Sequence, residues 1–338
     1  MKLVALVVAL LLLIIAGAWY LRRNAPVRSV VVYCSVDQVY AEPILARFTR
    51  QTGIRVLPVY DVEATKTTGL ATRLITEKPH PRADVFWNNE FANTLRLQEE
   101  GVLAPYRSPC ASDLPTQFFD HSGYWTGVGA RARVLLVNTH RLSPANYPTT
   151  VRDLLNPRWP AADVGMASPL FGTASTHAAA LYATLGPEKA REFYAQVQAR
   201  GVRILDGNSV VRDQVASGQL AWGITDSDDA LVALARHAPV AIVAPDQRTT
   251  GTLALPGTVA LVTDAPHAEE GRTLLDFLAS VQTEQALIDV GGCQFSLRGK
   301  TQKVPWLAAP LHLMHLPLRD VYRQAPRATR ELREIFIR

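Results

Sequence analysis

The chain has few of the residues on which small disulfide-rich domains and zinc clusters are built. It contains three cysteines, Cys34, Cys110 and Cys293, and no two of them lie at a CxxC spacing. This number excludes a disulfide framework, and no Cys/His zinc spacing is present. One disulfide and one free thiol remain possible, and the sequence does not determine which cysteines would pair.

Long runs of one charge are also absent. The 35 Lys and Arg residues against 30 Asp and Glu residues give a net charge of +5, spread along the chain. Without a Lys/Arg run or an RNA-binding aromatic motif, we expect no nucleic-acid partner. The 48% hydrophobic and 19% charged residues are typical of a packed globular protein. The length of 338 residues suits two domains of about 150 residues, or one large one.

Catalytic motifs are missing as well. The sequence has no GxSxG, HExxH, GxxxxGK[ST] or post-strand GxGxxG pattern. Cys34 follows a predicted strand directly and is the one candidate nucleophile, with a small buried thiol as the favoured alternative. We therefore expect a protein that is not an enzyme, and keep an enzyme on the same fold as an alternative.

One long apolar run is present, at the start of the chain. Residues 3–16 read LVALVVALLLLIIA, with Lys2 before them and the small residues Ala16-Gly17-Ala18 at the end. Residues 1–27 are therefore predicted to be a signal peptide or an N-terminal membrane anchor, with the remainder in the periplasm. Arg22 and Arg23 on the far side of the run do not favour export, and a buried N-terminal helix is the alternative.

Strands and helices alternate through the remaining sequence. Apolar, β-branched runs at 29–33, 54–60 and 84–87 are each followed by a helical pattern, at 39–52, 69–78 and 90–100. A second such series runs from 164 to 244. This alternation predicts an α/β fold with mostly parallel sheets covered by helices.

Two unusually long β-rich segments divide the two series. They are Tyr124–Asn138 and Gly251–Thr263, and each is long enough to leave one domain and enter another. We therefore predict a two-lobed, hinged clamshell in which two mixed sheets, flanked by helices, are joined by two crossing strands. The first lobe comprises residues 28–130 plus 257–338, and the second comprises 131–256. The basic amphipathic residues 319–338 are expected to form a helix on one lobe, with contact to a membrane or transporter as the alternative.

Short polar side chains follow strand after strand in this pattern. Because ligands in such sheets bind beyond the carboxyl ends of the strands, these residues are the predicted binding site. They are Ser35, Asp37, Thr65, Lys66, Thr67, Asn88, Asn89, Glu90, Gly172, Thr173, Asn208, Thr225 and Asp226. Hydroxyls and N–H groups at helix N-termini suit an anion, whereas the carboxylates of Asp37, Glu90, Asp226 and Asp228 suit an amine or a hard metal ion, and Asp37, Glu90 and Asp226 are the predicted metal ligands. For each residue alone, a helix cap, a turn or a solvated loop side chain is the competing interpretation.

Several of these segments resemble those of a known family. The strings VVYCSVD, YDVEATKTTGL, ADVFWNNE, GITDSDDA and PDQRTTGTLALPGTVALV are similar to the ferric-iron-binding type of bacterial periplasmic solute-binding proteins of ABC importers. The resemblance runs from about residue 29 to 298. It implies the type II periplasmic-binding-protein fold, a small charged solute as ligand and an ABC permease in the inner membrane as partner. We expect a monomer, and a membrane-anchored sensor is the alternative within this fold.

The resemblance also implies a ligand site from which this chain departs. The family's iron ligands are a histidine, a glutamate and an adjacent tyrosine pair, and these positions correspond to Asp37, Asn89 next to Glu90, and Thr225-Asp226. The family's anion-binding positions correspond to Gly172-Thr173 and Asn208. Two ligands remain: a phosphate- or phosphonate-bearing solute, zwitterionic if the carboxylates hold an amine, or ferric iron held by carboxylate oxygens. No cofactor is expected apart from such a transported Fe(III) or anion.

Overall fold

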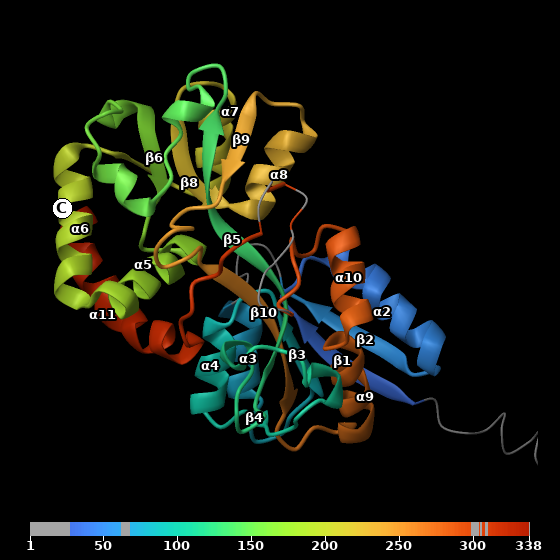
Figure 1. The fold of residues 1–338 in the computed structure, drawn as a ribbon. Coiled ribbons are helices and arrows are strands. Elements are labelled where there is room, and N and C mark those ends of the chain that lie inside the picture. Colours follow the sequence, from blue (N-terminus) through green and yellow to red (C-terminus); the bar gives the residue numbers. More distant parts are fainter. Residues whose placement is uncertain (1–27, 62–67, 299–303, 305, 308–309, 338) are drawn as a thin grey trace, which may run out of the picture.

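The computed structural model describes residues 28–61, 68–298, 304, 306–307 and 310–337. The predicted leader, residues 1–27, and the predicted ligand residues Thr65, Lys66 and Thr67 lie outside these ranges. Within the described residues, two groups of strands, each with its own helices, lie one above the other and meet at a central strand (Figure 1). The two-lobed α/β fold predicted from the sequence is confirmed.

The first lobe contains a mixed sheet with strand order β2-β1-β3-β10-β5. β1 pairs in parallel with β2 and β3, whereas β10 is antiparallel to β3, β4 and β5. Its strands are β1 (Ser29–Cys34), β2 (Arg55–Tyr60), β3 (Val85–Asn88), β4 (Leu103–Ala104) and β10 (Ala254–Val262). Its helices are α2 (Gln38–Thr52), α3 (Thr68–Thr76), α4 (Ala92–Glu99), α9 (Ala268–Leu278) and α10 (Val281–Asp289).

The second lobe repeats this plan. β8 and β9 are antiparallel to β5, and β6 lies parallel to both β8 and β7. Its strands are β6 (Val164–Ala167), β7 (Arg203–Leu205), β8 (Trp222–Asp226) and β9 (Val240–Val243). Its helices are α5 (Gly172–Leu185), α6 (Pro187–Arg200), α7 (Asn208–Ala216) and α8 (Ser227–Ala235).

β5 (Thr126–Asn138) belongs to both sheets. Residues 126–132 pair with β10, and residues 133–138 pair with β8 or β9. The strand is buried along almost its whole length, which explains why its sequence is apolar rather than alternating. The chain returns to the first lobe beside it, where the amide of Arg133 donates to the carbonyl of Leu253. The prediction of a crossing strand at Tyr124–Asn138 is therefore confirmed.

The last helix, α11 (Leu318–Phe336), packs mainly on α5 and α6 of the second lobe. This packing differs from the sequence prediction, which places the whole of residues 257–338 in the first lobe. The other lobe boundaries remain a prediction. The physical reason is the apolar stripe of α11, in which Leu318, Val321, Ala328 and Leu332 are buried. Alanine-rich α5 provides a smooth apolar surface for that stripe, with Ala178 and Ala179 fully buried.

Membrane-spanning helices were sought in the described part of the chain. Not one of its helices combines the length and the apolar character that crossing a bilayer requires.

Candidate functional site

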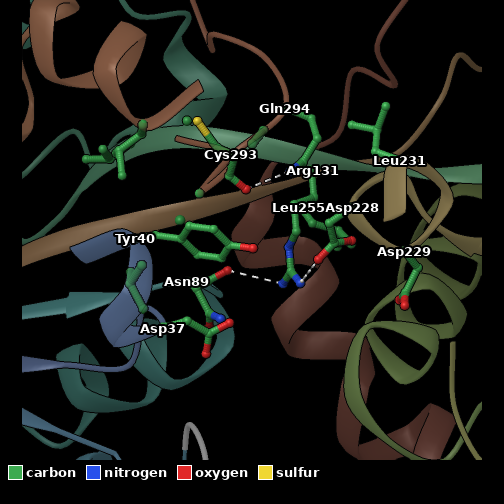
Figure 2. Close-up of a pocket in the computed structure, with 18 of the residues that line it drawn as sticks. Asp37, Tyr40, Asn89, Arg131, Asp228, Asp229, Leu231, Leu255, Cys293 and Gln294 are labelled. Carbon is green, nitrogen blue, oxygen red and sulfur yellow. Dashed lines mark hydrogen bonds and ion pairs between the residues drawn. The ribbon is translucent and has the colours of Figure 1, made fainter. Parts of the chain in front are cut away.

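A cavity of about 330 Å³ lies where the two lobes meet (Figure 2). The first lobe contributes Asp37 and Tyr40 after β1 and Asn88 and Asn89 at the end of β3. The second lobe contributes one face of α8, which begins directly after β8. Residues of β5, of β10 and of the loop after α10 form the floor. The cavity therefore lies at the carboxyl ends of strands from both sheets, as expected for this class of fold.

Arg131 of β5 stands in the middle of this cavity, and its side chain is 18% exposed. Figure 2 shows Tyr40 and Asn89 on one side of its guanidinium and Asp228 and Asp229 on the other. Its Nη1 donates to Asp228 Oδ2 (3.2 Å), and its Nη2 donates to the backbone carbonyl of Asn89 (3.3 Å). Arg131 therefore contacts both lobes at once.

The charge of Arg131 is retained despite burial. Burial alone lowers the pKa of its guanidinium, but the nearby carboxylates of Asp228, Asp226 and Glu90 outweigh burial and raise that pKa. A guanidinium has five N–H donors, and the two contacts above use only two of them. The cavity thus presents a permanent cation with remaining donor capacity.

Three carboxylates lie beside this cation. Asp226, Asp228 and Asp229 each place an oxygen within 4.8 Å of the others. Burial and the charges of Asp228 and Asp226 raise the pKa of Asp229 to about 6. Asp229 also accepts from Arg212 Nη1 at 3.0 Å. Two of these carboxylates, Asp228 and Asp229, therefore line the cavity together with Arg131.

A second arginine, Arg133, anchors a buried polar cluster behind this wall. Its Nη1 donates to Asp226 Oδ1 (2.6 Å), to Asn208 Oδ1 (2.9 Å) and to Thr173 Oγ1 (3.3 Å). Thr173 Oγ1 also donates to Asp226 Oδ2 at 2.6 Å. Thr173, Asn208 and Asp226 lie at the start of α5, at the start of α7 and at the end of β8. The cluster therefore fixes the positions of three loops that face the first lobe.

The pKa of Asp226 reflects this cluster. Burial alone would raise the pKa of its carboxyl, but Arg133, Arg131 and the bond from Thr173 outweigh burial and hold that pKa below its usual value. Asp226 is thus a permanent anion paired with Arg133, both at most 3% exposed. Two further donors of Arg133, Nε and Nη2, are buried and have no hydrogen-bond partner among the residues that the structure describes.

The structure divides the predicted site residues into groups. Asp37, Asn88 and Asn89 line the cavity. Thr173, Asn208 and Asp226 form the cluster around Arg133, and Thr225 Oγ1 donates to the carbonyl of Asn208 beside it. Gly172 begins α5 next to this cluster, with φ of 54°. The assignment of all these residues as ligand contacts remains a prediction.

Two predicted residues make contacts within the first lobe, Ser35 with the loop after β2 and Glu90 within its own loop. Ser35 Oγ donates to Asp61 Oδ2 at 3.1 Å. Glu90 Oε1 accepts from the amide of Ala92, and burial raises the pKa of the Glu90 carboxyl. The predicted metal ligands are Asp37, Glu90 and Asp226. The carboxylates that the structure brings together are instead Asp226, Asp228 and Asp229.

Sequence reasoning missed the two arginines. Both lie in the string ARARVLLVN of a strand that is otherwise apolar, and both side chains point to the same face because they are two residues apart. A pair of charges inside a buried strand was the available signal. Tyr40, which follows Asp37 by one helical turn, was also missed.

The candidate nucleophile Cys34 is a buried thiol in this fold, and His177 is a buried imidazole. Burial raises the pKa of Cys34, whose Sγ donates to the carbonyl of Val36 at 3.6 Å. Burial and then the charge of Arg133 lower the pKa of His177 to about 3, so its ring is neutral. All three cysteines are free thiols, Cys34 and Cys293 buried and Cys110 exposed.

Comparison with known proteins agrees with this geometry. Over 197 residues the chain is 25% identical to the "Fe(3+)-binding periplasmic protein" of Serratia marcescens, covering 58% of this chain and 56% of that protein. The iron-bound HitA of Pseudomonas aeruginosa superposes with a TM-score of 0.76 at 21% identity, over 92% of this chain and all of that one.

A second solved structure binds a different ligand. AfuA of Actinobacillus pleuropneumoniae, solved with fructose-6-phosphate bound, superposes with a TM-score of 0.70 at 19% identity, over 91% of this chain and 98% of that one. These likenesses show the fold alone. The family described as "Bacterial extracellular solute-binding protein" matches residues 81–311. Since this match covers most of the chain, the protein belongs to the bacterial extracellular solute-binding proteins.

Proposed function

We propose that this protein is the periplasmic solute-binding component of an ABC importer, and that its ligand carries a phosphate-type anion. The observation that carries the proposal is Arg131, a permanent cation in the cavity between the lobes that contacts both of them. Closure of the lobes around the ligand would complete the site, and the closed form would dock on a permease in the inner membrane. A monomer suffices for this role.

The chemistry of Arg131 favours an oxyanion. A guanidinium donates two parallel hydrogen bonds to a phosphate or phosphonate, which fixes its orientation as well as its charge. The partly buried site strengthens that attraction relative to water. An anion there would compete with Asp228 for Nη1 and reach donors that the present contacts do not use.

The carboxylates beside Arg131 favour a solute that also carries an amine. Asp228 and Asp229 lie within 4.8 Å of each other through their oxygens, together with Asp226. An amine next to the anion would neutralise part of this negative charge. An aminoalkylphosphonate combines both groups and is the ligand class that this wall fits best.

Ferric iron is the second candidate. The same three carboxylates favour it, because Fe(III) is a hard cation that prefers oxygen ligands, and the Serratia relative is described as binding Fe(3+). However, Asp226 and Asp228 are already paired with Arg133 and Arg131. Iron would have to displace Arg131 or bind together with an anion.

The experiment is a thermal-shift and calorimetric panel of inorganic phosphate, 2-aminoethylphosphonate, fructose 6-phosphate and ferric citrate. A ligand that binds the folded chain raises its melting temperature by mass action. We expect the phosphonate to bind, and we expect Arg131→Gln to weaken it about tenfold to a hundredfold, since hydrogen bonds to charged groups contribute about 1.5–3 kcal/mol. Arg141→Gln is the matched control, because Arg141 pairs with Asp163 away from the cavity.

A second variant separates the two candidates. Asp228→Asn removes a carboxylate from the group and leaves Nη1 of Arg131 without that counter-charge. An anion receptor keeps or strengthens its binding of inorganic phosphate in this variant, whereas an iron receptor loses ferric binding. If none of the four solutes binds to the parent chain, the proposed ligand class is wrong.

A further inference from the structure

α11 touches both lobes, and its first two turns contact the first lobe. Arg319 Nη2 donates to Asp120 Oδ1 at 2.8 Å, and Tyr322 OH donates to Glu99 Oε2 at 3.0 Å. Glu99 is the last residue of α4, and Asp120 lies in the loop that leads into β5. Arg319 and Tyr322 are three residues apart and therefore share one face of the helix.

The remainder of α11 is fixed to the second lobe. Leu332 is fully buried, and Tyr182 OH of α5 donates to Glu331 Oε2 at 3.1 Å. Arg327 Nη2 donates to Glu188 Oε1 of α6 at 3.1 Å. The helix thus packs as part of the second lobe, and its bonds to Glu99 and Asp120 of the first lobe come from its first two turns.

This connection lies on the side of the molecule away from the cavity. In Figure 1, α11, α5 and α4 lie to the left of β5, and α8, α10 and α2 lie to its right. The residues that line the cavity come from β5, β10, α8 and the segments around α2, β3 and α10, and α11 contributes none of those described. β5 therefore separates the helix from the binding cavity.

We propose that Arg319 and Tyr322, in the first two turns of α11, form a clasp that stabilises the open arrangement of the two lobes. When two lobes bend about β5 and close over the cavity, their faces on the opposite side move apart. The bonds Arg319–Asp120 and Tyr322–Glu99 cross that opposite side, so closure must lengthen or break them. Arg319 and Tyr322 act as positioning residues that set the affinity without touching the ligand.

The clasp changes the affinity through the fraction of closed molecules. Apparent affinity scales with the population of the binding-competent state, so a contact made only in the open state weakens binding. Asp120 also accepts from the amides of Ser122 and Tyr124, and those bonds remain when Arg319 is replaced. Removing the clasp therefore leaves the first lobe folded.

The test combines Arg319→Gln with Tyr322→Phe in the full chain. We expect this variant to bind the solute that the parent binds about three- to tenfold more tightly, the effect of removing two partly exposed polar contacts. Arg327→Gln is the matched control, because it removes a similar bond on the same helix that lies within the second lobe. The control should bind with the parent's affinity.

A second readout needs no ligand. Dyes at Val39→Cys on α2 and at Gln219→Cys, exposed between α7 and β8 and outside the cavity lining, report the distance between the lobes by energy transfer in a Cys110→Ser background. The clasp variant should show a larger closed fraction than the parent and the control.

The clasp rests on the proposed function only in its affinity measurement. If no solute of the panel binds but the variant shifts the energy transfer, the proposed ligand class fails and the clasp stands. If the variant binds no more tightly than the parent and the energy transfer is unchanged, or if Arg327→Gln has the same effect, the clasp is overturned.

Discussion

The buried ion pair of Arg133 and Asp226 is the residue-scale feature on which the second lobe most depends. We predict that Asp226→Asn lowers the free energy of unfolding by about 3–5 kcal/mol, because it leaves the guanidinium of Arg133 buried without a counter-charge. Urea denaturation at pH 7 measures this loss. Asp163→Asn, which removes the partner of exposed Arg141, should cost less than about 1 kcal/mol.

The pH dependence of this pair has a definite sign. The folded pKa of Asp226 is lowered from its usual 3.8, so its stabilisation is present above that value and is lost as the pH falls through the lowered pKa. Because the charge of Asp226 also raises the pKa of Asp229 to about 6, the comparison is made in an Asp229→Asn background, where the loss caused by Asp226→Asn should stay constant from pH 7 to about 5. A difference that already shrinks at pH 6 contradicts the assignment.

Asp229 behaves in the opposite way. Its folded pKa is raised from 3.8 to about 6 by burial and by Asp228 and Asp226, so the folded state loses stability as the pH rises through this window. We predict that Asp229→Asn is more stable than the parent at pH 7 by about 1–2 kcal/mol, with the lost bond from Arg212 reducing the gain. The difference should disappear near pH 4. Denaturation at both pH values checks this, and a variant less stable at pH 7 contradicts it.

At this scale the sequence predicted residue types better than their contacts. It selected Asp226, Thr173 and Asn208 because each follows a strand, but the partner that all three share in the structure is Arg133, more than thirty residues away from each. A pattern based on strand ends does not include a charge placed inside a crossing strand. Burial decided the role of Asp226, and burial depends on contacts that are distant in the sequence.

At the scale of elements, α11 depends on its apolar stripe. We predict that Leu332→Ala lowers the free energy of unfolding by about 2–4 kcal/mol, because Leu332 is fully buried and its removal leaves a cavity. Arg330→Ala, on the exposed face of the same helix, should change it by less than about 0.5 kcal/mol. Equal losses in the two variants would show that the helix does not pack as described.

The elements themselves were largely predictable because local rules determine them. Gly53 ends α2 in the left-handed conformation, with φ of 72°, at the position where the sequence predicted the end of that helix. The register shift in β10 between Pro256 and Gly257 was not predictable, nor was the choice of α5 as the partner of α11. Both depend on which surfaces meet, and a period in the sequence shows that a face is apolar but not what covers it.

At the scale of the whole molecule, the two lobes are coupled more tightly than a hinge alone implies. One contiguous group of buried side chains includes Phe86 of the first lobe, Trp222 of the second and Val321 of α11. β5 is a strand of both sheets, so neither sheet stays intact without it. Unfolding one lobe would expose apolar surface of the other.

We therefore predict a single cooperative thermal transition, with a calorimetric enthalpy equal to the van't Hoff enthalpy. A bound solute should shift this whole transition upward, because the ligand stabilises both lobes together. Differential scanning calorimetry with and without the phosphonate measures both quantities. Two separated transitions would mean that the shared strand and α11 do not couple the lobes, and so would a ligand that shifts only part of the heat absorption. The affinity change expected of the clasp would then have to arise within one lobe.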